Sequence, residues 1–148
     1  LRRQVEKLGV KLVTDQDSLI DVCDILSFHV PATDQTRNMV NANFLAKLAP
    51  GTIIINTSRG DLIDEPALIE IMDKKDIFVG LDVYRNEPGT AQGEFDSALA
   101  RHPNVYGTHH IGASTTQAQI AVAAGVIEVI DAFTSGHMIN CVNPSIGQ

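Results

Sequence analysis

The sequence contains no tryptophan, and only 5% of its 148 residues are aromatic. Its two cysteines, Cys23 and Cys141, lie far apart and lack the spacing of metal ligands. No uninterrupted apolar run approaches the roughly 18 residues that a membrane-spanning helix requires, and no signal-peptide pattern opens the chain. These absences argue against a disulfide-stabilised secreted domain, a membrane protein and a cysteine-based metal site. They favour reduced thiols in a cytoplasmic protein.

Positive charge is also scarce. The 11 lysines and arginines are outnumbered by 18 aspartates and glutamates, which gives a formal net charge of −7. Because an acidic surface repels phosphate backbones, nucleic acid is not an expected partner. The remaining composition, 44% hydrophobic and 20% charged, is ordinary for a globular chain. Its length is sufficient for one domain with a hydrophobic core.

Short apolar runs alternate with longer amphipathic runs along the chain. Runs of β-branched apolar residues bounded by turn residues predict buried strands, and apolar residues at helical spacing predict helices. Alternating strands and helices imply parallel pairing with right-handed crossovers, and therefore an α/β sheet. The predicted strands are Val10–Val13, Ile25–Val30, Thr52–Asn56, Ile77–Val83 and Asn104–Thr108, and the shorter predicted helices are Ser18–Val22, Asn41–Leu48 and Pro66–Asp73.

The last predicted helix is the longest. Ser114 precedes Gln117 by three positions, which predicts a capping box at its start, and Gly136 is a plausible stop. The polar stretch Asn86–Asp96 is predicted to be a surface loop, and the tail Asn140–Gln148 shows no periodicity.

Polar residues follow the predicted strands at the positions where open parallel sheets bind ligands. Arg59 follows the second clear strand, Asp82 and Glu87 follow the third, and His110 follows the fourth. The planar arginine fork suits a carboxylate, and histidine exchanges protons near neutral pH. Gly60 would let the backbone turn sharply so that a ligand can approach. Each residue alone could be a solvated or structural one, but their convergence on one edge predicts a site.

Three motifs carry a resemblance to a known family. They are Asn-Thr-Ser-Arg-Gly at Asn56–Gly60, Gly-Leu-Asp-Val-Tyr followed by Glu-Pro within Gly80–Pro88, and His-Ile-Gly-Ala-Ser-Thr at His110–Thr115. Their order and spacing resemble the D-isomer-specific 2-hydroxyacid dehydrogenases across essentially the whole chain. The turn after His110 looks most like the phosphoglycerate dehydrogenase branch, because other branches often place an aromatic residue there.

The resemblance implies the C-terminal portion of a Rossmann-like doubly wound parallel sheet that binds NAD. Residues 1–139 would be a partial NAD-binding domain, and residues 140–148 would begin the connection to a substrate domain. The family's phosphate-binding Gly-x-Gly-x-x-Gly turn and the acidic residue that selects NAD over NADP do not occur here. We therefore expect part of a longer polypeptide that lacks the first βαβ unit, binds NAD poorly alone, and is a homo-oligomer when intact.

The resemblance also implies roles. Arg59 would clamp the carboxylate of the substrate, His110 would be the general acid and base, Glu87 would hydrogen-bond His110, and Asp82 would bind the nicotinamide carboxamide. No metal is expected. The other residues that would line the cofactor are Val30, Pro31, Thr36, Thr57, Ser58, Ile111, Gly112 and Ala113, with Arg59 and His110 also in contact.

Several alternatives remain open. His109 stands where the family usually has proline, so it is a second candidate for the acid and base, although the spacing to Gly112 favours His110. The expected substrate pair is 3-phosphoglycerate and 3-phosphohydroxypyruvate, as in serine biosynthesis. Glyoxylate, hydroxypyruvate or D-lactate would suit the same chemistry. A non-catalytic, corepressor-like NAD-binding module shares the fold, and a formate dehydrogenase fits less well because that branch typically has glutamine in place of Glu87.

Overall fold

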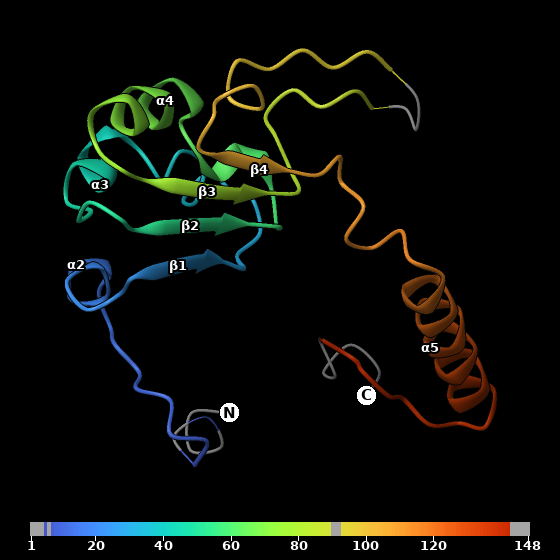
Figure 1. The fold of residues 1–148 in the computed structure, drawn as a ribbon. Coiled ribbons are helices and arrows are strands. Elements are labelled where there is room, and N and C mark those ends of the chain that lie inside the picture. The colour runs from blue at the N-terminus through green and yellow to red at the C-terminus, as the bar shows by residue number, and fades with distance from the viewer. Residues whose placement is uncertain (1–4, 6, 90–92, 143–148) are drawn as a thin grey trace. The chain divides into compact units, whose positions relative to one another are not determined.

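The computed structural model describes residue 5, residues 7–89 and residues 93–142. It divides the chain into two compact units, Leu1–His109 and His110–Gln148. The first unit holds a four-stranded sheet, and the second holds one long helix (Figure 1). All three strand pairings in the sheet are parallel. The α/β class predicted from the sequence is therefore confirmed.

The strands lie in the sheet in the order in which they occur in the chain, β1-β2-β3-β4. Each is slightly shorter than the apolar run that predicted it, because pairing stops where the chain turns into a loop. The strands are β1 (Ile25–Phe28), β2 (Ile53–Asn56), β3 (Phe78–Leu81) and β4 (Val105–Gly107). The predicted strand Val10–Val13 is wrong, since this segment forms no ladder with the sheet and is mostly exposed.

Helices occupy the connections between the first three strands. They are α2 (Gln16–Ile20), α3 (Ala42–Ala46), the short 3-10 helix η1 (Gly60–Leu62) and α4 (Glu65–Lys74). Asp64 caps α4, because its carboxylate accepts a hydrogen bond from the Ala67 N–H at 3.2 Å. Pro66 stands in the first turn of α4, where it costs no helical hydrogen bond. No helix lies in the connection from β3 to β4 within the described residues, as the predicted loop at Asn86–Asp96 required.

One face of the sheet carries the core. Leu26, Ile54 and Val79 stand side by side on β1, β2 and β3 and are 4%, 0% and 1% exposed. Helices α3 and α4 lie over this face (Figure 1), and Leu45 and Leu68 on these helices are fully buried. The hydrophobic effect thus fixes the two helices against the strands.

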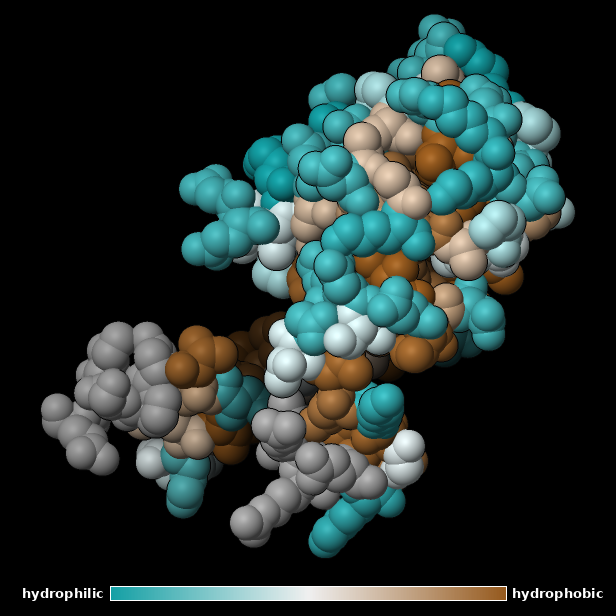
Figure 2. Space-filling view, turned by 90° about the vertical axis from the view of Figure 1, so that its left-hand side faces the viewer, coloured by the Kyte–Doolittle hydropathy of each residue, from teal (hydrophilic) through white to brown (hydrophobic). Residues whose placement is uncertain are grey.

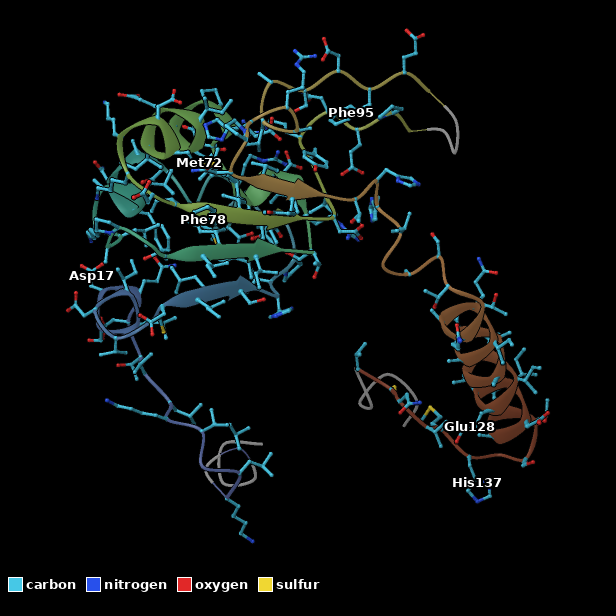
Figure 3. All side chains as sticks on the ribbon, viewed as in Figure 1. Asp17, Met72, Phe78, Phe95, Glu128 and His137 are labelled. Atoms are coloured by element: carbon cyan, nitrogen blue, oxygen red, sulfur yellow. The ribbon has the colours of Figure 1, made fainter. Side chains whose placement is uncertain are left out.

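The opposite face of the same strands is open within this unit. Ile25, Ile53 and Phe78 form one row across β1, β2 and β3 and are 55%, 36% and 41% exposed. Figure 3 shows Phe78 on β3, below α4 with its buried Met72. Successive side chains of a strand point to opposite faces, so the row lies away from α3 and α4. Helices therefore cover one face in this unit, where the doubly wound expectation had helices on two.

The second unit is built on α5 (Thr116–Thr134). The Thr115 hydroxyl caps it by accepting a hydrogen bond from the Ala118 N–H at 3.1 Å. The predicted capping box at Ser114 is wrong, because the helix starts one residue later. The predicted stop is confirmed: Gly136 has a φ of +79°, and the His137 N–H donates to the Ala132 carbonyl at 2.8 Å, as in a Schellman motif.

Helix α5 is apolar, yet none of its residues is buried. Its 19 residues have a mean hydropathy of 1.3, which by length and composition alone is enough for a membrane span. This average differs from the expectation drawn from uninterrupted apolar runs, and a helix from the core of a soluble protein has the same properties. Large exposed apolar side chains occur in both units, and such side chains appear as brown areas among teal ones in Figure 2.

Candidate active site at the carboxyl ends of the strands

Hydrogen bonds join the carboxyl ends of β2, β3 and β4. The Asp82 N–H donates to the Asn56 carbonyl at 3.1 Å, and the Thr108 N–H donates to the Leu81 carbonyl at 2.8 Å. The Thr108 hydroxyl also donates to a carboxylate oxygen of Asp82 at 2.5 Å. Asp82, only 6% exposed, is therefore held at the end of its strand by the neighbouring strand.

The turn that carries Arg59 is organised by Asn56. The Asn56 side chain is fully buried, and its Nδ2 donates to the Arg59 carbonyl at 2.9 Å. Its Oδ1 accepts from the Ser58 N–H at 3.1 Å and from the Ser58 hydroxyl at 2.8 Å. This arrangement leaves Thr57 and the guanidinium of Arg59 exposed. Sequence reasoning gave Asn56 no role, although an asparagine at the end of a strand is a recognised turn signal.

Gly60 is required by the chain's own backbone. A Cβ atom at this position would lie 2.1 Å from the Tyr84 carbonyl carbon and 2.5 Å from the Arg85 nitrogen. Because no side chain fits in that space, the backbone after Arg59 can lie directly against the backbone that leads to Glu87. The sequence analysis had assigned Gly60 to the approach of a ligand, and the structure assigns it to this backbone contact instead.

Carboxylates gather around Tyr84. The Tyr84 N–H donates to the Glu87 carboxylate, and the Tyr84 ring is 8% exposed. Burial raises the pKa of the Tyr84 phenol, and the nearby charges of Glu65, Asp82 and Glu87 raise it further. The negative potential that raises this pKa would equally favour a positive group placed beside these carboxylates.

The loop after β1 carries the predicted cofactor residues Val30, Pro31 and Thr36. The Thr36 hydroxyl donates to the Pro31 carbonyl at 2.6 Å and accepts from the Thr33 N–H at 2.8 Å. Thr36 therefore shapes this loop through contacts within the chain. The Asn38 N–H donates to the Asp61 carbonyl at 2.9 Å, which joins the loop to the turn after β2.

The predicted residues His110, Ile111, Gly112 and Ala113 are exposed and begin the second unit. His110 has a φ of +59°, in the left-handed region that few residues other than glycine adopt. The Ser114 N–H donates to the Ile111 carbonyl at 2.9 Å and closes the turn. Each unit is described by itself, so the expected pairing of Glu87 with His110 stays a prediction.

The first unit thus brings together the predicted residues of three loops at one edge of the sheet. Pro31 and Thr36 come from the loop after β1, Ser58 and Arg59 from the turn after β2, and Asp82 and Glu87 from the loop after β3. Among the residues that the structure describes, no three histidine, cysteine, aspartate or glutamate side chains are grouped as metal ligands would be. The edge therefore offers a guanidinium, carboxylates and hydroxyls.

Comparison with known proteins gives a consistent family. Hydroxypyruvate reductase from Thermotoga maritima is 44% identical over 117 residues, which are 78% of this chain and 38% of that protein. D-3-phosphoglycerate dehydrogenase from Synechocystis is 42% identical over 87% of this chain and 22% of its own length. The chain thus spans well under half the length of these curated relatives.

Solved structures agree with the sequence relatives. The D-lactate dehydrogenase of Lactobacillus jensenii, crystallised with NAD+, superposes with a TM-score of 0.73 at 29% identity, over 86% of this chain and 41% of that one. The family model described as "D-isomer specific 2-hydroxyacid dehydrogenase, NAD binding domain" matches residues 1–112. The chain therefore belongs to the D-isomer-specific 2-hydroxyacid dehydrogenase family, and it is part of that family's NAD-binding domain.

Proposed function

We propose that the protein containing this chain transfers a hydride between NAD(H) and a D-2-hydroxy or 2-oxo acid. The observation that carries this proposal is the placement of Arg59, Asp82 and Glu87 at one edge of a parallel sheet in a chain of this family. This edge is where open α/β sheets bind ligands. An arginine beside carboxylates provides both an anion clamp and groups that act on protons.

The residues of the edge fit a nicotinamide dinucleotide. The potential that raises the Tyr84 pKa would favour the positive nicotinamide ring of the oxidised cofactor. Asp82 would hold the carboxamide, and the loop containing Pro31 and Thr36 would line the cofactor. When bound, NAD supplies the hydride acceptor or donor, which protein side chains lack.

The chain's own residues would orient the acid and move one proton. Arg59 would bind the substrate carboxylate through its planar fork and place C2 for hydride transfer. His110 in its charged form would donate a proton to the developing alkoxide, and in its neutral form it would take the hydroxyl proton. Glu87 would orient the ring of His110 and favour its charged form.

For the substrate we propose 3-phosphoglycerate and 3-phosphohydroxypyruvate, as in serine biosynthesis. Several relatives named D-3-phosphoglycerate dehydrogenase align with 84% to 90% of this chain, and these matches support the choice. Relatives named hydroxypyruvate reductase and glyoxylate/hydroxypyruvate reductase keep those acids as the second candidates. We further propose a cytoplasmic homo-oligomer without nucleic acid or membrane partners, in which residues 1–139 belong to the NAD-binding domain and residues 140–148 begin a connection.

The direct test is turnover of NADH by the complete product of the gene, measured at 340 nm against a panel of 2-oxo acids. We expect 3-phosphohydroxypyruvate to give the highest kcat/KM. Preference for glyoxylate, hydroxypyruvate or pyruvate would keep the reaction and discard the substrate. Binding of NADH without turnover of any acid would replace the enzyme with a non-catalytic binding module.

Variants of the same protein assign the roles. His110→Ala should abolish turnover while NADH still binds, whereas His109→Ala should stay active, and the reverse result would exchange the two histidines. Arg59→Ala should raise KM for the acid strongly and lower kcat. Glu87→Gln should move the histidine-dependent limb of the pH–rate profile to lower pH, because the charged imidazole loses its carboxylate partner. An unmoved limb would exclude the Glu87–His110 pair.

A further inference from the structure

Arg85 connects three segments that the sequence keeps apart. It lies two residues before Glu87 on the loop after β3, and its side chain is 27% exposed. Its Nη2 donates to the side-chain oxygen of Asn38, on the loop after β1. The same nitrogen reaches the Asp61 carbonyl at 3.5 Å, in the turn after β2. We name the set Asn38, Asp61 and Arg85 the Arg85 tie.

The charges around the tie are complementary. The Nε of Arg85 is buried and has no hydrogen-bond partner in the described part of the chain, but it lies 4.0 Å from the Asp61 carboxylate. Arg37 donates to the same carboxylate oxygen at 2.8 Å. The Arg85 N–H donates to a carboxylate oxygen of Glu65 at 2.7 Å. A guanidinium can bridge several acceptors because its donors form a rigid fork.

The tie lies next to the backbone contact at Gly60. Asp61 is two residues after Arg59, and Arg85 follows the Tyr84 carbonyl against which Gly60 is packed. The Asn38 N–H donates to the Asp61 carbonyl that also faces Arg85. Movement of the Arg85 side chain would therefore release the turn of Arg59 on one side and the loop before it on the other.

We propose that Arg85 is a positioning residue, which fixes the Arg59 turn relative to the Glu87 loop and the loop after β1. This inference rests on the proposed function, in which Arg59 holds the substrate carboxylate. A clamp that is displaced by about an ångström binds its anion in a less productive geometry. Arg85 thus acts on the substrate through Arg59 and makes no contact with the substrate itself.

The first test compares Arg85→Ala with Arg101→Ala in the complete gene product. Arg101 pairs with Asp96 at an exposed site and is 67% exposed, so its variant removes the same charge away from the tie. We expect Arg85→Ala to raise KM for the 2-oxo acid by about tenfold with a smaller fall in kcat, and Arg101→Ala to leave both unchanged. Arg85→Lys keeps the charge without the fork and should restore only part of the KM. An unchanged KM in Arg85→Ala would overturn the proposal, even if that variant melts at a lower temperature.

A double variant separates the tie from a general loss of structure. Asn38→Ala combined with Arg85→Ala should raise KM little more than Arg85→Ala alone, because both changes break the same contact. Independent, multiplicative increases in KM would overturn the Asn38 part of the tie.

A second measurement keeps the proposal testable if the wild-type protein turns over no acid, which would refute the proposed function. Amide hydrogen exchange of the 148-residue chain reports the Asn38 N–H, whose acceptor is the Asp61 carbonyl. This amide should exchange about fivefold faster in Arg85→Ala than in wild type or Arg101→Ala. Equal rates in the three proteins would refute the tie independently of any activity.

Discussion

The two faces of the sheet are made from the same strands but are buried very differently. Ile53 and Ile54 are neighbours on β2, yet Ile53 is 36% exposed and Ile54 is completely buried. The same contrast occurs between Ile25 and Leu26 on β1. Residue type therefore does not determine burial here. What decides it is that α3 and α4 pack on one side of the strands.

The difference teaches that the helix-covered face stabilises this unit, whereas the open row is suited to a further layer. Parallel sheets are usually covered on both faces, and this chain corresponds to only part of its relatives' length. The first two predictions and the last change one face or its helix layer, and the third examines the core beside the site.

The largest effect is expected from Ile54→Ala. Removing this fully buried side chain from the covered face should lower the free energy of unfolding by about 3 kcal/mol, because atoms are lost from a packed core and a cavity remains. Ile53→Ala is the matched control and should cost about 1 kcal/mol or less. Urea unfolding of the 148-residue chain measures both, and equal losses would refute the distinction between the faces.

Loss of the helix cap should be the next largest effect. Asp64→Ala removes the acceptor of the Ala67 N–H at the start of α4 and should lower the free energy of unfolding by about 1 kcal/mol. Asp64→Ser keeps a capping oxygen and should restore most of that loss. If the alanine and serine variants unfold at the same urea concentration, the cap does not stabilise the helix layer.

High pH should weaken the core beside the site. Burial, together with Glu65, Asp82 and Glu87, raises the Tyr84 pKa, so the folded chain holds the phenol proton more tightly than the unfolded chain. This stabilisation is complete below a pH of about 10 and is lost as the pH rises through the raised value. Tyr84→Phe should make the free energy of unfolding fall less steeply above about pH 10. Parallel curves for wild type and variant would contradict the shift.

The smallest change in stability is expected from Ile25→Thr on the open row, where the side chain is 55% exposed. Threonine keeps the branched shape, so the free energy of unfolding should change by no more than about 0.5 kcal/mol. Self-association of the 148-residue chain, measured by sedimentation velocity, should decrease because the apolar row becomes more polar. In the complete gene product the same variant should be more destabilising if another layer covers this face.

Part of the site was predictable because it depends on local patterns. The β-branched run at Thr52–Asn56 predicted β2, and the polar residues after it predicted the turn that carries Arg59. Asp82 is placed at the end of β3 in the same way. The buried amide of Asn56 was missed because its role depends on which side of the turn faces the core. The cap at Thr115 was missed by one residue because Ser114 is an equally good capping residue in sequence terms.

The sequence by itself determined the alternation of strands and helices, the parallel sheet and the order of the motifs at its carboxyl edge. These follow from periodicity and turn chemistry, which act over a few residues. Only the tertiary structure decided which face of β2 is buried, why Gly60 must lack a side chain, and that Arg85 meets Asn38, 47 positions earlier. The physical reason is that burial and long-range hydrogen bonds depend on which segments pack together. Local patterns of residues do not contain that information.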